Sequence, residues 1–411
     1  MKKRKVYVFA GAYRAALYGI GTYIELLIAC MKDSDIDFEL IYLNAKGQEV
    51  SSIEKDGYRQ ISIPTVNYTQ RNARYYARNV VYILRELIPE DKNIQYLFHL
   101  NFMENPELAM YLRKMFRSKT VLVVHYTNWS FSLSGNYQQL KTILHKPSKQ
   151  LDPSERLIRQ SVYNEKKMIP NCKQLVFVAK HTMDAFSDLH SIDPAKCLVV
   201  NNALRDTYNP MSCLQKSSLR QKYQISDDTF VILFAGRFDD VKGVSFLIKA
   251  FKKIAKENPQ ARLIIAGEGN FSQWLKESDK YWTKITFTGR LDKKQLYEFY
   301  NIADVGVICS LHEEFGLVAL EMMMHALPVV VTKTGGLDEI VEDNVSGLKV
   351  PVRTLKGKRQ VDVRCLSEKI QLLLDNPSLA KEIGENGRKR FLDKFELSVF
   401  KEKILNLYNN L

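Results

Sequence analysis

Short apolar runs rich in Val, Ile and Phe alternate with longer amphipathic stretches along the whole chain. The runs lack strict alternation of apolar and polar positions, which is typical of strands buried on both faces of a parallel sheet. We therefore predict an α/β fold in which helices connect the strands and cover both faces. The predicted strands cover residues 5–10, 38–43, 96–100, 120–125, 174–178 and 197–201, and then 230–235, 262–266, 285–288, 305–309, 328–331 and 347–350.

A polar stretch up to residue 228 separates the two series of strands. A chain of 411 residues has the length of two domains, each with its own core. We predict two Rossmann-like domains, residues 1–206 and 207–396, facing each other across a cleft, and a C-terminal helix 397–411 that can pack back on the first domain. Ligands in such folds bind at the carboxyl ends of the strands. Residues 356–362 are expected to form an exposed loop.

Composition and charge narrow the choice of partners. The chain is 45% hydrophobic and 26% charged, as in a folded soluble protein. Its net charge is +14, and residues 1–200 hold 28 Lys and Arg against 19 Asp and Glu. The basic first half favours anionic partners, such as phosphates or anionic lipid headgroups, without choosing among them.

The cysteines and the N-terminus bear on the compartment. Six cysteines are scattered singly without a Cys-x-x-Cys pair, and we interpret them as reduced core thiols, which favours the cytoplasm. The apolar stretch after the basic N-terminus is too short for a secretion signal, and no run approaches the roughly 18 apolar residues of a membrane span.

A glycine-bounded loop follows the strand predicted at residues 230–235. The loop runs from Gly236 to Gly243 and carries Arg237 and Lys242. Arginine can bind two phosphate oxygens through its planar fork, lysine adds a compact charge, and the start of the following helix adds main-chain N–H groups. These features predict a diphosphate-binding loop, although the two cations could also be solvated surface charges.

A second glycine pair lies near the N-terminus, where Gly19 and Gly21 open a predicted helix. A dinucleotide-binding fingerprint would need a third glycine where Ile24 stands and an acid where the second strand ends at Asn44. The oxidoreductase interpretation therefore fails twice. A purely structural turn remains an alternative for these glycines.

Two glutamates follow the strand predicted at residues 305–309. Glu313 lies in the loop after the strand, and Glu321 lies in a predicted helix that begins at Phe315. A carboxylate can accept hydrogen bonds from two adjacent hydroxyls, so the pair suits polyol recognition. An unpaired charge among the apolar neighbours of Glu321 would be expensive to bury, which favours a function for it.

The second half resembles a known family through a set of motifs. These are Gly236-Arg237 with Lys242-Gly243, Gly267-Glu268-Gly269, Ser310 with Glu313 and Glu321, Pro328-Val329-Val330, and Gly335-Gly336. Together they resemble the group 1 (family 4-like) retaining glycosyltransferases, which have the GT-B fold. Weaker similarities lie in the first half, among them His125 at a strand end and Glu165. Glu314 departs from the pattern, because that position is commonly glycine.

The resemblance implies a role for each matching residue. Arg237 and Lys242 would hold the donor diphosphate, Glu321 the ribose hydroxyls, and Glu313 the transferred sugar, with Glu314 as an alternative carboxylate. His125 would contact the donor sugar. The remaining donor-binding residues would be Gly21, Phe315, Gly316 and Leu317, with Arg290 and Leu291 near the nucleobase.

The resemblance also implies an activity: transfer of a hexose-type sugar, with retention, from a nucleoside-diphosphate sugar, UDP being favoured, to an acceptor hydroxyl. The acceptor would be a glycan, polysaccharide or lipid-linked sugar, contacted by residues 68–78 and 129–136, and the basic half could touch the anionic inner face of the membrane. No metal or cofactor is expected, and no Asp-x-Asp pair follows a strand. A nucleotide-sugar epimerase and a glucan phosphorylase remain alternatives. A nucleic-acid binder is not expected, because the chain lacks a known nucleic-acid motif.

Overall fold

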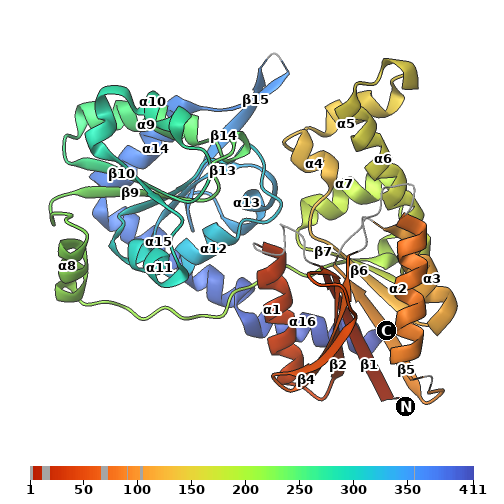
Figure 1. Cartoon of the computed structure of the whole chain (residues 1–411). Helices are drawn as coiled ribbons and strands as arrows, with labels where there is room; N and C mark the ends of the chain where they lie inside the picture. The colour runs from red at the N-terminus through yellow and green to blue at the C-terminus, as the bar shows by residue number, and fades with distance from the viewer. Residues whose placement is uncertain (1–2, 12–18, 66–72, 90, 102–104, 356) are drawn as a thin grey trace. The chain divides into compact units, whose positions relative to one another are not determined.

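The chain folds into two compact units in the computed structural model (Figure 1), which describes residues 3–11, 19–65, 73–89, 91–101, 105–355 and 357–411. The first unit comprises residues 1–202 and 400–411, and the second comprises residues 203–399. The first unit ends four residues before the boundary placed at residue 206 from the sequence, and the chain returns to it at Phe400, inside the C-terminal helix.

The first unit is built on an eight-stranded sheet of order β3-β4-β2-β1-β5-β6-β7-β8, parallel except for the β3–β4 pair. Its strands are β1 Lys3–Gly11, β2 Asp37–Ala45, β3 Ser51–Lys55, β4 Tyr58–Pro64, β5 Ile94–Leu100, β6 Lys119–Val124, β7 Gln174–Phe177 and β8 Cys197–Val199. Its helices are α1 Gly19–Lys32, α2 Ala73–Leu87, α3 Pro106–Phe116, α4 Asn128–Ser132, α5 Tyr137–His145, α6 Pro153–Met168, α7 Lys180–His190 and most of α16 Leu397–Asn410.

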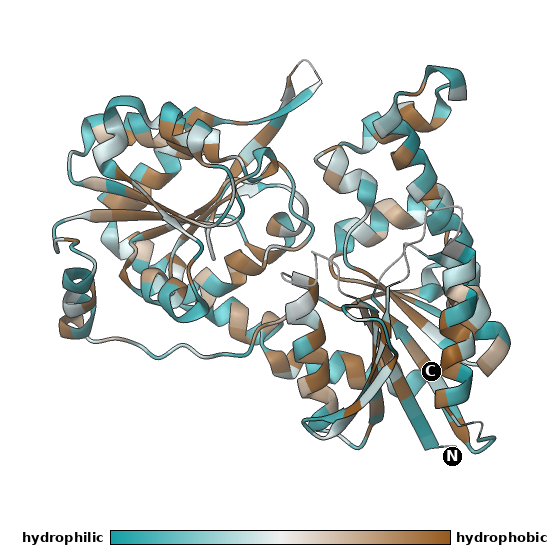
Figure 2. Ribbon diagram, in the orientation of Figure 1, coloured by the Kyte–Doolittle hydropathy of each residue, from teal (hydrophilic) through white to brown (hydrophobic). Residues whose placement is uncertain are grey.

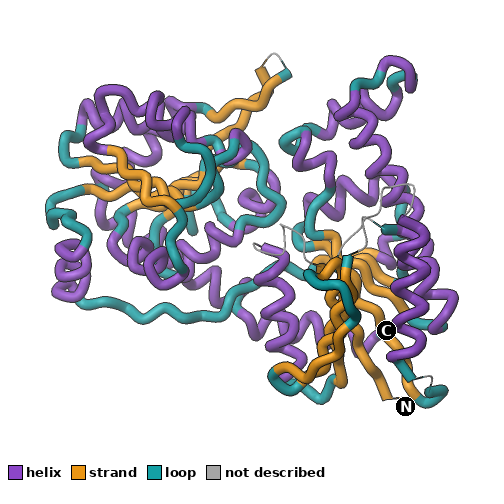
Figure 3. The backbone as a smooth tube through the Cα atoms, in the orientation of Figure 1, coloured by secondary structure: helices purple, strands orange, loops and turns teal. Residues whose placement is uncertain are grey.

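The second unit holds a seven-stranded sheet of order β11-β10-β9-β12-β13-β14-β15, in which only the β14–β15 pair is antiparallel. Its strands are β9 Phe230–Ala235, β10 Ala261–Ala266, β11 Ile285–Gly289, β12 Val305–Ile308, β13 Val329–Lys333, β14 Leu348–Leu355 and β15 Lys358–Val361. Its helices are α8 Cys213–Lys222, α9 Val244–Glu257, α10 Ser272–Ser278, α11 Lys293–Ile302, α12 Leu317–Met324, α13 Gly335–Ile340, α14 Val363–Asp375 and α15 Pro377–Phe395. The alternation of strands and helices is clear in the backbone trace of Figure 3.

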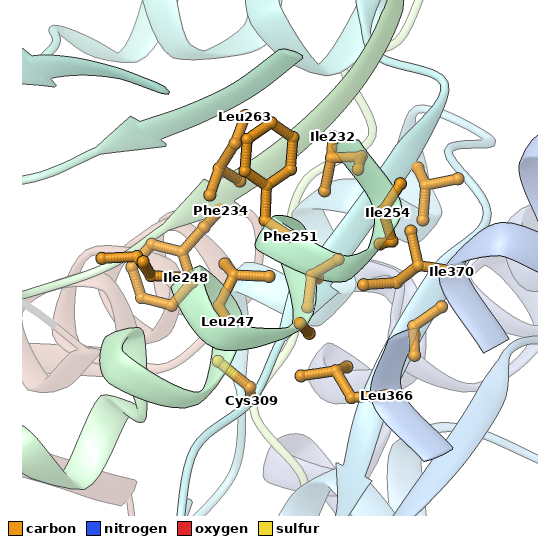
Figure 4. Packing of buried hydrophobic residues seen from close by; sticks show 14 of the residues in the cluster. Ile232, Phe234, Leu247, Ile248, Phe251, Ile254, Leu263, Cys309, Leu366 and Ile370 are labelled. Atoms are coloured by element: carbon orange, nitrogen blue, oxygen red, sulfur yellow. The ribbon is translucent and has the colours of Figure 1, made fainter. Parts of the chain in front are cut away.

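Apolar side chains explain why these segments form layers. Strands β9 and β10 are largely brown in Figure 2, because helices cover both faces of their sheet. Phe251 of α9 is fully buried and packs with Phe234 of β9, Leu263 of β10 and Ile370 of α14 (Figure 4). Burying a side chain of this size stabilises the fold by about 1.5–3 kcal/mol.

Two expectations from the sequence are wrong. Residues 358–361 form the edge strand β15, paired with β14, where an exposed loop was expected. Cys213 is exposed at the start of α8, so it is not a core thiol. No helix in the described ranges is long and apolar enough to cross a membrane.

Candidate functional site

The loop after β9 is shaped by its glycines. Gly243 has φ +73°, and a Cβ there would lie 2.1 Å from the main-chain oxygen of Cys309, at the end of the neighbouring strand β12. The main-chain N–H of Leu311 donates to Val241 O at 2.7 Å. Only a glycine lets these two loops approach so closely. The parallel pairing of β9 with β12 thus brings the glycine-bounded loop against the segment that carries Glu313.

Lys242 and Glu313 are the central pair of this site. Lys242 Nζ lies 2.6 Å from Glu313 Oε2, and both side chains are 19% exposed. The Ser310 hydroxyl donates to the same carboxylate oxygen at 3.1 Å. Arg237, the other predicted cation, pairs with Asp239 at 3.2 Å. A charged pair at the carboxyl ends of two neighbouring strands can bind an anionic ligand through the cation and hydroxyl groups through the carboxylate.

The segment that follows Glu313 is held by α13. The Gly336 N–H donates to Glu313 O at 2.8 Å, and a Cβ on Gly336 would lie 2.3 Å from Phe315 O. The helix α12 begins at Leu317 rather than at Phe315, because Gly316 has φ +112°, which a continuing helix excludes. Phe315 is buried and lies edge-on to Phe395, with ring centroids 6.1 Å apart.

Glu321 lies in the second turn of α12, half-buried, and Tyr300 is its main partner. The buried Tyr300 hydroxyl donates to Glu321 Oε2 at 2.8 Å. Burial raises the pKa of Glu321, while the hydrogen bond from Tyr300 and the charge of Lys293 oppose that rise. The Glu321 main-chain oxygen accepts from His325 Nδ1 at 2.8 Å, which fixes the end of the helix. The carboxylate is therefore anchored at one oxygen.

Arg290 and Leu291 follow β11, beside the Gly267–Gly269 loop that follows β10. Arg290 Nη1 lies 3.5 Å from Glu268 Oε2, and the Gly267 N–H donates to Gly289 O at 2.9 Å. Arg290 is exposed and Leu291 is half-buried. These two predicted residues thus lie at the same edge of the sheet as Arg237 and Lys242.

His125 and Gly21 lie in the first unit. His125 directly follows β6, is 8% exposed, and has its Nε2 3.0 Å from Asn101 Oδ1. Burial lowers the pKa of His125 to about 3, so the ring is neutral at pH 7. The ring of Tyr23, two residues after Gly21 in the first turns of α1, lies edge-on to His125 with centroids 4.7 Å apart. Gly21 and His125 are thus linked through Tyr23.

The two segments expected to contact the acceptor, residues 68–78 and 129–136, differ in how far their side chains are exposed. Residues 68–72 lie outside the described ranges. Tyr75 of α2 is 52% exposed, with the Arg74 guanidinium stacked 4.8 Å from its ring centroid. In the segment 129–136, Trp129 is 4% exposed and packs in a small core with Leu140 and Ile158, whereas Phe131 is 46% exposed. The acceptor contact of this segment stays a prediction. The indole ring of Trp129 contributes apolar area to this core, although its Nε1 is buried without a hydrogen-bond partner.

Sequence reasoning missed Ser310, Tyr300 and Asn101 as partners of the predicted residues. Ser310 was quoted only as part of a motif, and Tyr300 lies in an ordinary amphipathic helix, α11. Asn101 follows β5, the strand beside β6, so the parallel order of the strands was the available signal for its contact with His125.

Two α/β units, each built on a largely parallel sheet, are the architecture of the GT-B class of fold. Residues 215–390 match the family model described as glycosyl transferases group 1. The matched residues include Arg237, Lys242, Glu313 and Glu321, so the second unit of this chain is similar to the group 1 glycosyltransferases.

Known proteins agree with this assignment. An uncharacterized glycosyltransferase of Methanocaldococcus jannaschii is 29% identical over 244 residues, which are 57% of this chain and 59% of that protein. The capsular polysaccharide biosynthesis glycosyltransferase CapM of Staphylococcus aureus is 31% identical over 199 residues, 48% of this chain and 50% of CapM. The chain thus spans little more than half the length of these relatives.

Solved structures share the fold along the whole chain. Sucrose-phosphate synthase from Thermosynechococcus elongatus has a TM-score of 0.76 at 20% identity, and the match covers 99% of this chain and 98% of the synthase chain. HepE from Anabaena, solved with UDP and glucose, has a TM-score of 0.70 at 18% identity and covers 100% of both chains.

Proposed function

We propose that this chain transfers a hexose-type sugar from a nucleoside-diphosphate sugar, with UDP as the nucleotide, to an acceptor hydroxyl, with retention at the anomeric carbon and without a metal ion. The observation that carries the proposal is the contact of Lys242 with Glu313 at 2.6 Å. Arg237 lies in the same loop as Lys242, and Glu321 lies in α12, the helix that follows the loop of Glu313. This set joins cations for a diphosphate to carboxylates for two groups of hydroxyls.

Each residue has a defined task in the proposed reaction. Lys242 and Arg237 bind the diphosphate and stabilise the charge that grows on it as the sugar leaves, which is where electrostatic catalysis acts. Glu321 accepts hydrogen bonds from the ribose hydroxyls, and Glu313 accepts them from the sugar. Two cations supply the charge stabilisation that a divalent ion supplies in other transferases, which supports the proposed metal independence. Activity lost in EDTA and restored by Mg²⁺ would contradict it.

The relatives support a glycan or lipid-linked acceptor. CapM is named for capsular polysaccharide biosynthesis, and other relatives are a lipopolysaccharide N-acetylglucosaminetransferase of Salmonella typhimurium and a glycogen synthase of Mycobacterium tuberculosis. The exposed Tyr75 and Tyr82 on α2, together with Arg74 and Arg78, offer stacking and charge to an anionic lipid-linked acceptor in the cytoplasm or at the membrane surface. Cosedimentation with anionic but not neutral vesicles, abolished in an Arg74→Glu, Arg78→Glu double variant, would support the surface contact.

The function is tested first by thermal shift with UDP, GDP and ADP and then by turnover. A ligand that binds only the folded state at a hundred times its Kd adds about 2.7 kcal/mol of stability. We expect UDP to give the largest shift, and UDP-glucose to yield a glycoside whose anomeric configuration matches the donor. Release of an epimerised UDP-sugar, or of a sugar phosphate from glucan and phosphate, would instead assign the epimerase or phosphorylase activity.

A further inference from the structure

The buried amide of Asn101 lies between two partners at the carboxyl edge of the first sheet. Its Nδ2 donates to the main-chain oxygen of Phe9 at 3.0 Å, and its Oδ1 lies 3.0 Å from His125 Nε2. A main-chain carbonyl can only accept a hydrogen bond, so the amide nitrogen must face Phe9 and the amide oxygen must face His125. The orientation of the amide is therefore set by β1, independently of the histidine.

This orientation determines where the proton of His125 lies. A neutral imidazole carries one N–H and one acceptor nitrogen. Because the Asn101 oxygen can only accept, Nε2 must be the protonated nitrogen, and Nδ1 must hold the lone pair. The ring of Tyr23 lies against the imidazole at 80° and restrains its rotation.

We propose that Asn101 is a positioning residue that holds His125 in the Nε2–H tautomer, so that Nδ1 presents an acceptor to a hydroxyl of the transferred sugar. The statement about the tautomer depends only on the first unit. The statement about the sugar rests on the proposed function.

The tautomer implies a substrate class. An acceptor nitrogen pairs with a hydroxyl, which can donate, but not with an ionised carboxylate, which can only accept. A neutral hexose therefore suits His125, and a uronic acid with its carboxylate at that point is disfavoured, because two facing acceptors lack a proton to share.

Selective ¹⁵N labelling of the seven histidines of the full chain tests the tautomer by NMR at pH 7. The His125 signals are identified by their loss in His125→Gln. We expect a protonated Nε2 and an unprotonated Nδ1 in the wild type. We expect a shift toward Nδ1–H in Asn101→Leu, which offers Nε2 no acceptor. A wild type with Nδ1–H, or an Asn101→Leu variant that keeps the wild-type tautomer, overturns the role of Asn101.

Turnover then tests the sugar contact. We expect Asn101→Leu to lower kcat with UDP-hexose about tenfold or more, the effect of losing one hydrogen bond. Circular dichroism checks that the Leu variant is folded, and if it is not, the wild-type spectrum still decides the tautomer. A changed tautomer with unchanged kcat refutes the sugar contact. The predicted tautomer in a protein that transfers no sugar refutes the proposed function and leaves the assignment of Asn101 intact.

Discussion

The ammonium of Lys242 and the carboxylate of Glu313 lie 2.6 Å apart, although the two residues are 71 positions apart in the sequence. In the proposed reaction, the diphosphate and the Glu313 carboxylate compete for the same cation. The charge of Lys242 is thus held in place before a ligand arrives, which reduces the entropy lost on binding.

Replacing Lys242 with Ala should weaken the binding of UDP by roughly 10- to 100-fold, the effect of losing one hydrogen bond to a charged group. Uridine, which has no phosphate, should bind the variant and the wild type alike. Isothermal titration with both ligands measures the difference. Lys249→Ala, on the exposed face of α9, is the matched control. Unchanged UDP affinity in the Lys242 variant would remove Lys242 from the diphosphate site.

Substitutions of Glu313 and of Glu314 should differ in their effect on kcat. Glu314 Oε1 pairs with His312 Nε2 at 3.1 Å, whereas Glu313 contacts Lys242 and Ser310. We expect Glu313→Gln to lower kcat by roughly 10- to 100-fold without weakening UDP binding, because Lys242 loses a competing partner. Glu314→Gln should change kcat by much less. If the Glu314 variant is the more damaged of the two, Glu314 is the carboxylate that binds the sugar.

The raised pKa of Glu321 predicts opposite pH effects on stability and binding. Below the ordinary glutamate pKa of 4.5 the group is protonated in both the folded and the unfolded state, so its contribution to stability is fully present there. That contribution is lost as the pH rises through the raised folded pKa. Ribose hydroxyls favour the ionised form, so UDP affinity should rise over the same range.

Urea unfolding and UDP titration of wild type and Glu321→Gln across this pH range test the assignment. The variant should lack both trends, because an amide does not titrate. If the UDP affinity of Glu321→Gln keeps the wild-type pH dependence, another group titrates. If the variant binds UDP with full affinity at every pH, Glu321 is not part of the ribose site.

The sequence was sufficient for most of the parallel strands because their apolar runs are continuous, as in β9 and β12, but it missed β4, which pairs in parallel with β2, and its antiparallel neighbour β3. It did not predict β15, because the Lys358–Val361 strand is polar and gains its stability from pairing with β14 at the sheet edge. The contact of Tyr300 with Glu321 was missed for a related reason: it joins two helices, and helical periodicity says which face is buried but not which neighbour it meets.

The buried His99 should make the first unit sensitive to acid. Its two nitrogens meet the hydroxyls of Tyr23 and of Tyr408 in α16, at 3.2 and 2.7 Å, and burial, with a smaller effect of His125, lowers its pKa to about 3. The unfolded chain binds a proton below pH 6.5 and the folded chain does not, so stability falls as the pH drops below 6.5. At pH 5 the loss is about 2 kcal/mol for this histidine. His99→Gln should reduce the difference in unfolding free energy between pH 7 and pH 5 by about that amount in urea titrations, whereas the exposed His145→Gln should not. An equal pH dependence in the His99 variant and the wild type would mean that His99 is not held neutral by its burial.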